Sequence, residues 1–133
     1  MSQEKKYYWI KLKTDFFNLK EIDFLLSQKG GCQYVVLYQM LCLLTANNKG
    51  QLATAIGDIM IPFDIDKIQR ETKYFSREVI ILAMDFFKKL GLIFEECDGI
   101  LTISGHSEMV GSETRWAQTK RLQRNKNLLS NGK

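Results

Sequence analysis

The segment from Phe63 to Ile103 constrains the fold of this chain most, because it combines two helix caps with a clear turn signal. Asp64 is a favourable N-cap for a helix from about Ile65 to Thr72. A turn of three residues follows, and Ser76 can cap a second helix from Arg77 to Leu90. Two helices joined by so short a turn form a helix–turn–helix pair.

Two short apolar strands follow the second helix, Leu92–Glu96 and Ile100–Ile103. Asp98-Gly99 between them is a strong signal for a tight hairpin turn. Helix, turn, helix and hairpin in this order predict a winged helix-turn-helix, a fold of the α+β class. The alternative is another α+β domain in which the hairpin only covers the two helices.

The residues before Phe63 predict extra elements on the N-terminal side of this unit. Tyr7–Lys13 alternates in the manner of a strand. Asn18 is the expected cap of a short helix, Leu19–Gln28, and the almost wholly apolar run Cys32–Asn47 predicts a central core helix. Gln51–Phe63 can form a small hairpin.

Positive charge is concentrated at the end of the chain. The net charge is +4, yet residues 112–133 hold six basic side chains and one acidic one, whereas residues 1–111 hold 13 and 14. Such asymmetry favours a nucleic-acid partner for the tail. We therefore expect a winged-helix domain over 1–111 and a basic helical or flexible tail over 112–133, with Ser112 as helix cap, that links to a C-terminal region outside this sequence.

The basic residues of the tail do not share a single helix face. We expect them to contact double-stranded DNA, and the alternative is a solvated helix or linker. The expected contacts in the tail are Arg115, Lys120, Arg121, Arg124 and Lys126.

In the body of the domain, the predicted DNA contacts lie where the second helix begins, since free backbone N–H groups there can bind phosphate. They are Lys73, Tyr74, Ser76 and Arg77. The tip of the predicted wing, Glu95–Asp98, carries three carboxylates and no basic residue, which argues against a phosphate contact there.

The outward face of the second helix is half apolar, because Ile81 and Met84 fall on it beside Arg77 and Lys88. Either these two side chains touch thymine methyl groups, or another helix or subunit covers them. We favour coverage and expect self-association into a homo-oligomer through Ile81 and Met84.

No catalytic, metal or cofactor site is predicted, so we do not expect an enzyme. His106 is the only histidine and is expected to be a cap or turn residue, and no P-loop or dinucleotide motif is present. Cys32 and Cys42 fit an apolar helical pattern and should pack in the core. The absence of a signal peptide or membrane span predicts a protein of the host cytoplasm, with no membrane partner.

Four segments of the chain form a recognisable set, namely KKYYWIKLKTDFFNLKEI, GGCQYVVLYQMLCL, FFKKLGLI and MVGSETRWAQTKRLQRN. The most specific parts are the GSET step before a basic segment and YYWIKLK. Over about Lys5 to Asn127 the chain resembles the N-terminal domain of phage replisome organisers, the replication initiators of phages and prophages of Gram-positive bacteria.

The resemblance implies a protein that binds the phage origin, associates with itself and recruits the helicase-loading machinery, with a helicase or its loader contacted through a C-terminal region. Two alternatives stay open. One is a phage transcriptional regulator of the same fold, and the other is a self-assembly module that binds little DNA.

Overall fold

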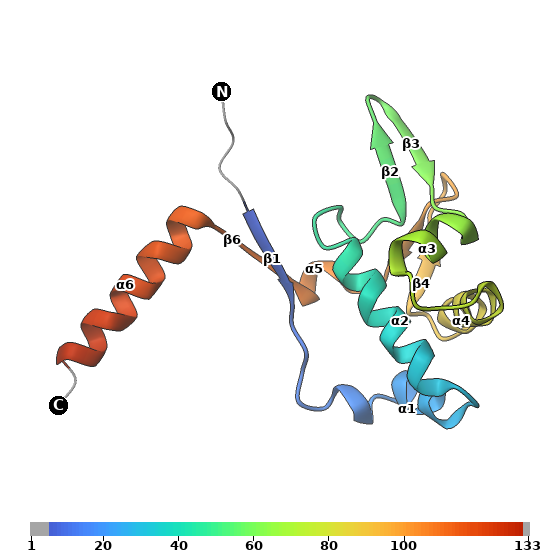
Figure 1. The fold of residues 1–133 in the computed structure, drawn as a ribbon, viewed down its shortest axis with the longest axis horizontal. Helices are drawn as coiled ribbons and strands as arrows, with labels where there is room; N and C mark the ends of the chain where they lie inside the picture. The colour runs from blue at the N-terminus through green and yellow to red at the C-terminus, as the bar shows by residue number, and fades with distance from the viewer. Residues whose placement is uncertain (1–5, 132–133) are drawn as a thin grey trace.

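The computed structural model describes residues 6–131, with the side chains of 115, 116, 118 and 127–131 left out. Helices and short antiparallel strands alternate along the chain, so the predicted α+β class is confirmed (Figure 1). The elements are β1 (Lys6–Ile10), η1 (Phe16–Asn18), α1 (Lys20–Ser27), α2 (Gly31–Leu44), β2 (Ala53–Ile56), β3 (Ile59–Pro62), α3 (Ile65–Thr72), α4 (Arg77–Lys89), β4 (Ile93–Glu95), β5 (Leu101–Ile103), α5 (His106–Met109), β6 (Val110–Thr114) and α6 (Arg115–Asn131).

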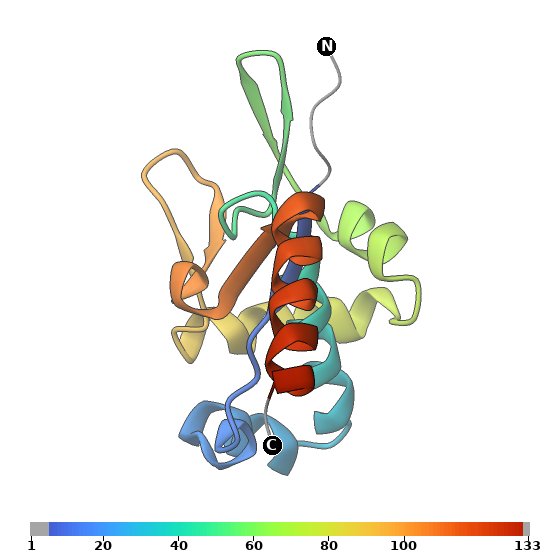
Figure 2. The same ribbon diagram turned by 90° about the vertical axis from the view of Figure 1, so that its left-hand side faces the viewer.

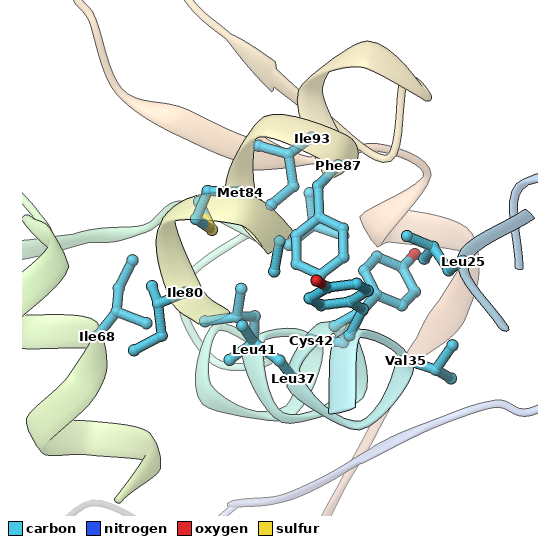
Figure 3. Packing of buried hydrophobic residues seen from close by; sticks show 14 of the residues in the cluster. Leu25, Val35, Leu37, Leu41, Cys42, Ile68, Ile80, Met84, Phe87 and Ile93 are labelled. Carbon is cyan, nitrogen blue, oxygen red and sulfur yellow. The ribbon is translucent and has the colours of Figure 1, made fainter. Parts of the chain in front are cut away.

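The hydrophobic core forms around α2, which packs against α1, α3 and α4. Leu37 and Leu41 of α2 are fully buried, and Phe87 points from α4 toward them (Figure 3). Ile68 joins α3 to the same cluster. Burying large aliphatic side chains of this kind supplies most of the free energy of folding, at about 25 cal/mol per Å² of apolar surface.

The predicted caps of the helix–turn–helix pair are confirmed. The Asp64 carboxylate accepts a hydrogen bond from the Lys67 backbone N–H at 2.7 Å, and Ser76 Oγ accepts one from the Val79 N–H at 3.2 Å. The β4–β5 hairpin follows α4 as expected, and Gln51 makes a single β-bridge to Thr102 of β5. The β4–β5 hairpin thus gains a third extended segment from the chain between α2 and β2.

The two ends of the described chain pair with each other. β1 lies antiparallel to β6, with Trp9 opposite Gly111 and Tyr8 opposite Ser112. The indole of Trp9 occupies the space beside Gly111, where an added Cβ would lie 2.3 Å from the indole Nε1. From β6 the chain passes directly into α6, which extends away from the helical body (Figures 1 and 2).

Three predicted details are wrong. Ser112 does not cap the tail helix, because it lies inside β6, and Thr114 Oγ accepts the Ala117 N–H at 3.1 Å instead. Asn18 makes no cap, since it ends the short helix η1 and α1 begins after Leu19. Cys32 is exposed, because it lies at the start of α2 rather than in the core.

No helix in residues 6–131 combines the length and apolar character needed to cross a membrane.

Candidate nucleic-acid interface

The turn between α3 and α4 brings four of the predicted DNA contacts together, because they are neighbours in the chain. Lys73 ends α3 in the left-handed conformation, with φ of 70°, and its N–H bonds to the Gln69 carbonyl. Tyr74 is the most exposed of the large hydrophobic residues that the structure describes, at 76%. Ser76 uses its hydroxyl to cap α4, so its side chain is already occupied.

Arg77 is the least available of the four. Its guanidinium forms a salt bridge with Asp66 of α3, and both side chains are about half exposed. A DNA phosphate would have to compete with this carboxylate for the guanidinium. Exposed ion pairs contribute little to stability, so exchanging Asp66 for a phosphate costs little free energy.

Other cations of the helix pair are also partnered along their own helices. Lys67 bonds Glu71 at 2.8 Å, and Lys89 bonds Asp85 at 2.9 Å. The Lys67 ammonium holds the pKa of the Glu71 carboxyl below its usual value. Within the described residues of α3 and its turn, Arg70 and Lys73 form no salt bridge.

The β4–β5 hairpin presents acidic groups at its tip. Glu95 and Asp98 are exposed, and Asp98 also accepts the Ile100 N–H at 3.0 Å, which closes the turn. Lys and Arg do not occur anywhere between residues 92 and 105. The charge of this hairpin therefore repels phosphate, as its sequence indicates.

Helix α6 carries the densest positive charge. Lys120, Arg121, Arg124 and Lys126 are all exposed, while the side chain of Arg115 lies outside the described residues. With about 100° of rotation per residue, Lys120, Arg124 and Arg121 fall within an arc of about 100°, and Lys126 lies on another side. Three cations thus share one broad face, which the sequence analysis did not recognise.

One of these three cations is held by a carboxylate. Glu113 of β6 accepts from Arg121 Nε at 3.0 Å and from Nη2 at 3.3 Å. The Glu113 side chain is only 14% exposed, so it lies against the junction between β6 and α6. The pair fixes the first turns of α6 to β6, and it raises the pKa of Arg121.

The expected outward position of Met84 is wrong. Met84 is 5% exposed and lies in the core beside Phe87 and Ile80, so it cannot contact a second subunit of the folded chain (Figure 3). The physical reason is that α4 packs against both α2 and α3, which buries a wider arc than one stripe. Ile81 is 47% exposed, and its role in self-association stays a prediction.

The small hairpin expected within Gln51–Phe63 is confirmed as β2–β3, but the sequence analysis did not foresee that its apolar side chains are exposed. Ile56 and Ile59 flank its turn and are 59% and 64% exposed. The available signal was Gly57-Asp58 between apolar residues, since glycine at the first turn position with φ of 60° suits a two-residue hairpin turn.

Burial raises the pKa of the Cys42 thiol to about 11, which keeps it protonated at neutral pH. No cluster of metal-binding side chains occurs among the described residues.

These features define a small α+β domain that couples a helix–turn–helix pair to a separate basic helix. Comparison with known families then identifies it, because the family described as the N-terminal phage replisome organiser matches residues 9–130. The chain belongs to this family, which indicates a role in phage replication. No curated protein and no solved structure gives a match.

Proposed function

We propose that this domain is the double-stranded DNA-binding part of a phage or prophage replication initiator. It binds the phage origin and helps to recruit the helicase-loading machinery. The observation that carries the proposal is the basic helix α6, whose exposed cations stand clear of the helical body on a two-stranded ribbon (Figure 1). An α-helix fits the major groove of B-DNA, and lysine and arginine on its surface contact phosphates on either side.

The arrangement of α3, α4 and β4–β5 supports a winged helix-turn-helix. Two capped helices are joined by a short turn and followed by a hairpin, and the Gln51–Thr102 bridge adds a third extended segment to that hairpin. In this proposal the turn supplies Lys73 and Tyr74 as secondary DNA contacts, with Arg70 beside them. The acidic hairpin tip stays away from the phosphates.

The remaining parts of the proposal come from family membership. An organiser acts in the cytoplasm of the bacterial host, forms homo-oligomers and contacts a helicase or its loader through a C-terminal region. Nothing in the helix–turn–helix pair requires a metal or cofactor for DNA binding, and we propose no enzymatic step.

Footprinting across the phage replication region tests the proposal, with an unrelated duplex of equal length as control. We expect protection at repeated sites in the origin. Uniform, weak protection of both duplexes would contradict it. Protection confined to a promoter would instead indicate a transcriptional regulator of the same fold.

A self-assembly module is the second candidate, and exposed apolar side chains favour it. Ile81 and Leu82 of α4 are each about half exposed. A protein that assembles but gives no footprint at any phage sequence would support this candidate over an initiator.

A further inference from the structure

The β2–β3 hairpin is not accounted for by the proposed DNA contacts. It projects beyond the helices in both ribbon views (Figures 1 and 2). Within the described residues its two strands pair only with each other, so neither outer edge has a strand partner, and Asn48 Nδ2 donates to the Ala53 carbonyl at the base at 2.8 Å. A two-stranded hairpin is marginally stable alone in water, and exposed strand edges commonly gain a partner.

One face of this hairpin gathers all of its isoleucines. Thr54 pairs with Ile61, and Ile56 pairs with Ile59. Because side chains alternate between the two faces of a strand, these four residues share one face. The three isoleucines are 46–64% exposed, so this isoleucine face is an apolar surface without a cover among the described residues.

The isoleucine face continues into a cleft at the base of the hairpin. The cleft holds about 290 Å³ and lies between the hairpin and α3, with Ile61 and Phe63 on one side and Lys67 and Arg70 on the other. Lys67 is bonded to Glu71, which leaves Arg70 as the cation of the cleft without a salt bridge among the described residues.

The charges of the hairpin and its cleft are complementary. Asp58, in the turn, is the only charged residue between Gln51 and Phe63, so the tip is acidic and the strands are neutral. Arg70 stands at the opposite end, beside the base, and two of the three charged side chains that line the cleft, Asp64, Lys67 and Arg70, are cationic. An apolar hairpin with a negative charge at its tip and a positive charge where it joins the domain is complementary to an inverted copy of itself.

We propose that the isoleucine face is a homodimer interface, in which two copies of the chain pack their hairpins face to face and antiparallel. A twofold axis places the tip of each hairpin beside the base of the other. Asp58 of each copy then lies near Arg70 of the partner subunit, while the isoleucines of both copies cover each other.

DNA is a poorer occupant of this face. The hairpin carries no Lys or Arg, and Asp58 at its tip would repel phosphate. An unrelated protein would need to match the acidic tip, the neutral strands and the basic cleft together, whereas a second copy matches all three by symmetry.

Sedimentation equilibrium of the full chain, without DNA, tests the interface. We expect the unaltered protein to dimerise and Ile59→Lys to weaken dimerisation at least tenfold, because a charge is placed in the apolar contact. Ile81→Lys tests the competing interface on α4, where self-association through Ile81 stays a prediction, because it puts the same charge on an isoleucine that is 47% exposed. If the hairpin is the interface, Ile81→Lys leaves dimerisation unchanged. Circular dichroism checks that each variant keeps its helices.

A charge exchange gives a sharper criterion. Asp58→Arg and Arg70→Asp should each weaken the dimer several-fold, because each places like charges together. The double variant Asp58→Arg/Arg70→Asp should recover most of the lost affinity, since it restores the pairing with reversed signs.

Each of the following results would overturn the proposal. The unaltered protein stays monomeric at every concentration measured. The dimer is unaffected by Ile59→Lys, or it is lost with Ile81→Lys alone. The double charge variant dimerises no better than the two single charge variants. If both isoleucine variants dissociate, the charge exchange decides: recovery supports the hairpin interface and failure to recover overturns it. Loss of DNA binding by Ile59→Lys with an intact dimer would assign the hairpin to DNA and overturn it as well.

Discussion

Replacing Glu113 by glutamine should strengthen DNA binding. Glu113 holds Arg121 through two hydrogen bonds, at 3.0 and 3.3 Å, on the side of α6 that also carries Lys120 and Arg124. Glutamine keeps the shape of the side chain and removes its charge, so the guanidinium becomes free to contact a phosphate. The pair lies where β6 meets α6, outside the hydrophobic core, so we expect the fold of the domain to remain intact.

The size of the effect follows from counterion release. One added phosphate contact steepens the slope of log K against log salt by about 0.9, and this corresponds to about eightfold tighter binding at 0.1 M salt and about threefold at 0.3 M. Fluorescence anisotropy with a labelled duplex, titrated from about 0.05 to about 0.3 M salt, measures both quantities. The affinity is read at each salt concentration, and the slope follows because log K falls linearly with log salt.

Two controls separate this mechanism from a general change in charge. Glu108→Gln removes an exposed carboxylate that forms no salt bridge with a described residue, so it should leave the slope unchanged. In an Arg121→Ala background, Glu113→Gln should lose its effect, because the cation it releases is absent. An unchanged slope for Glu113→Gln, with helix content preserved, would show that Arg121 does not contact DNA.

Three further changes test other parts of the structure. Truncation after Thr114, which keeps β6 but removes α6, should lower DNA affinity and flatten the salt slope by several units in the same titration, and equal binding would move the interface to the α3–α4 turn. Gly111→Ala should destabilise the protein by about 1–3 kcal/mol in urea unfolding, because the added methyl group collides with the Trp9 indole, and an unchanged stability would contradict that contact. At pH 8 a thiol reagent should modify Cys32 quickly and Cys42 only after unfolding, since Cys42 is buried with a pKa of about 11; fast labelling of every thiol in the native protein would refute its burial.

The helix–turn–helix pair could be predicted closely from the sequence because its signals are local. A cap acts on an N–H group two or three residues away, so Asp64 and Ser76 mark helix starts within their own turn. The same holds for Asp98-Gly99, which closes the β4–β5 turn with adjacent residues. Such signals need no knowledge of the rest of the chain.

Features that depend on distant segments could not be predicted in this way. Gly111 and Ser112 resemble a helix boundary when only their neighbours are considered, yet they extend a strand because β1 pairs with them from the other end of the chain. Met84 falls on the outer side of a helical wheel, but it is buried because α4 packs against both α2 and α3. A wheel shows where a side chain points and cannot show which helix lies there.

The basic face of α6 illustrates the same limit for the candidate site. Its basic residues can be read directly from the sequence. That three of them share one arc of the helix follows from the rotation of about 100° per residue. The restraint on Arg121 is different, since Glu113 approaches it only because β6 holds the carboxylate beside the first turns of α6.

The strand pair of β1 and β6 holds α6 at one end, so the helix acts as a lever arm. Its 17 residues span about 25 Å at 1.5 Å per residue, and their root is a strand pair rather than the core. A tilt of about 10° at that root would displace the far end of the helix by about 4 Å, which is on the order of one base-pair step. The spacing of the DNA sites that two such arms could reach together would therefore depend on the stiffness of one strand pair with five paired residues.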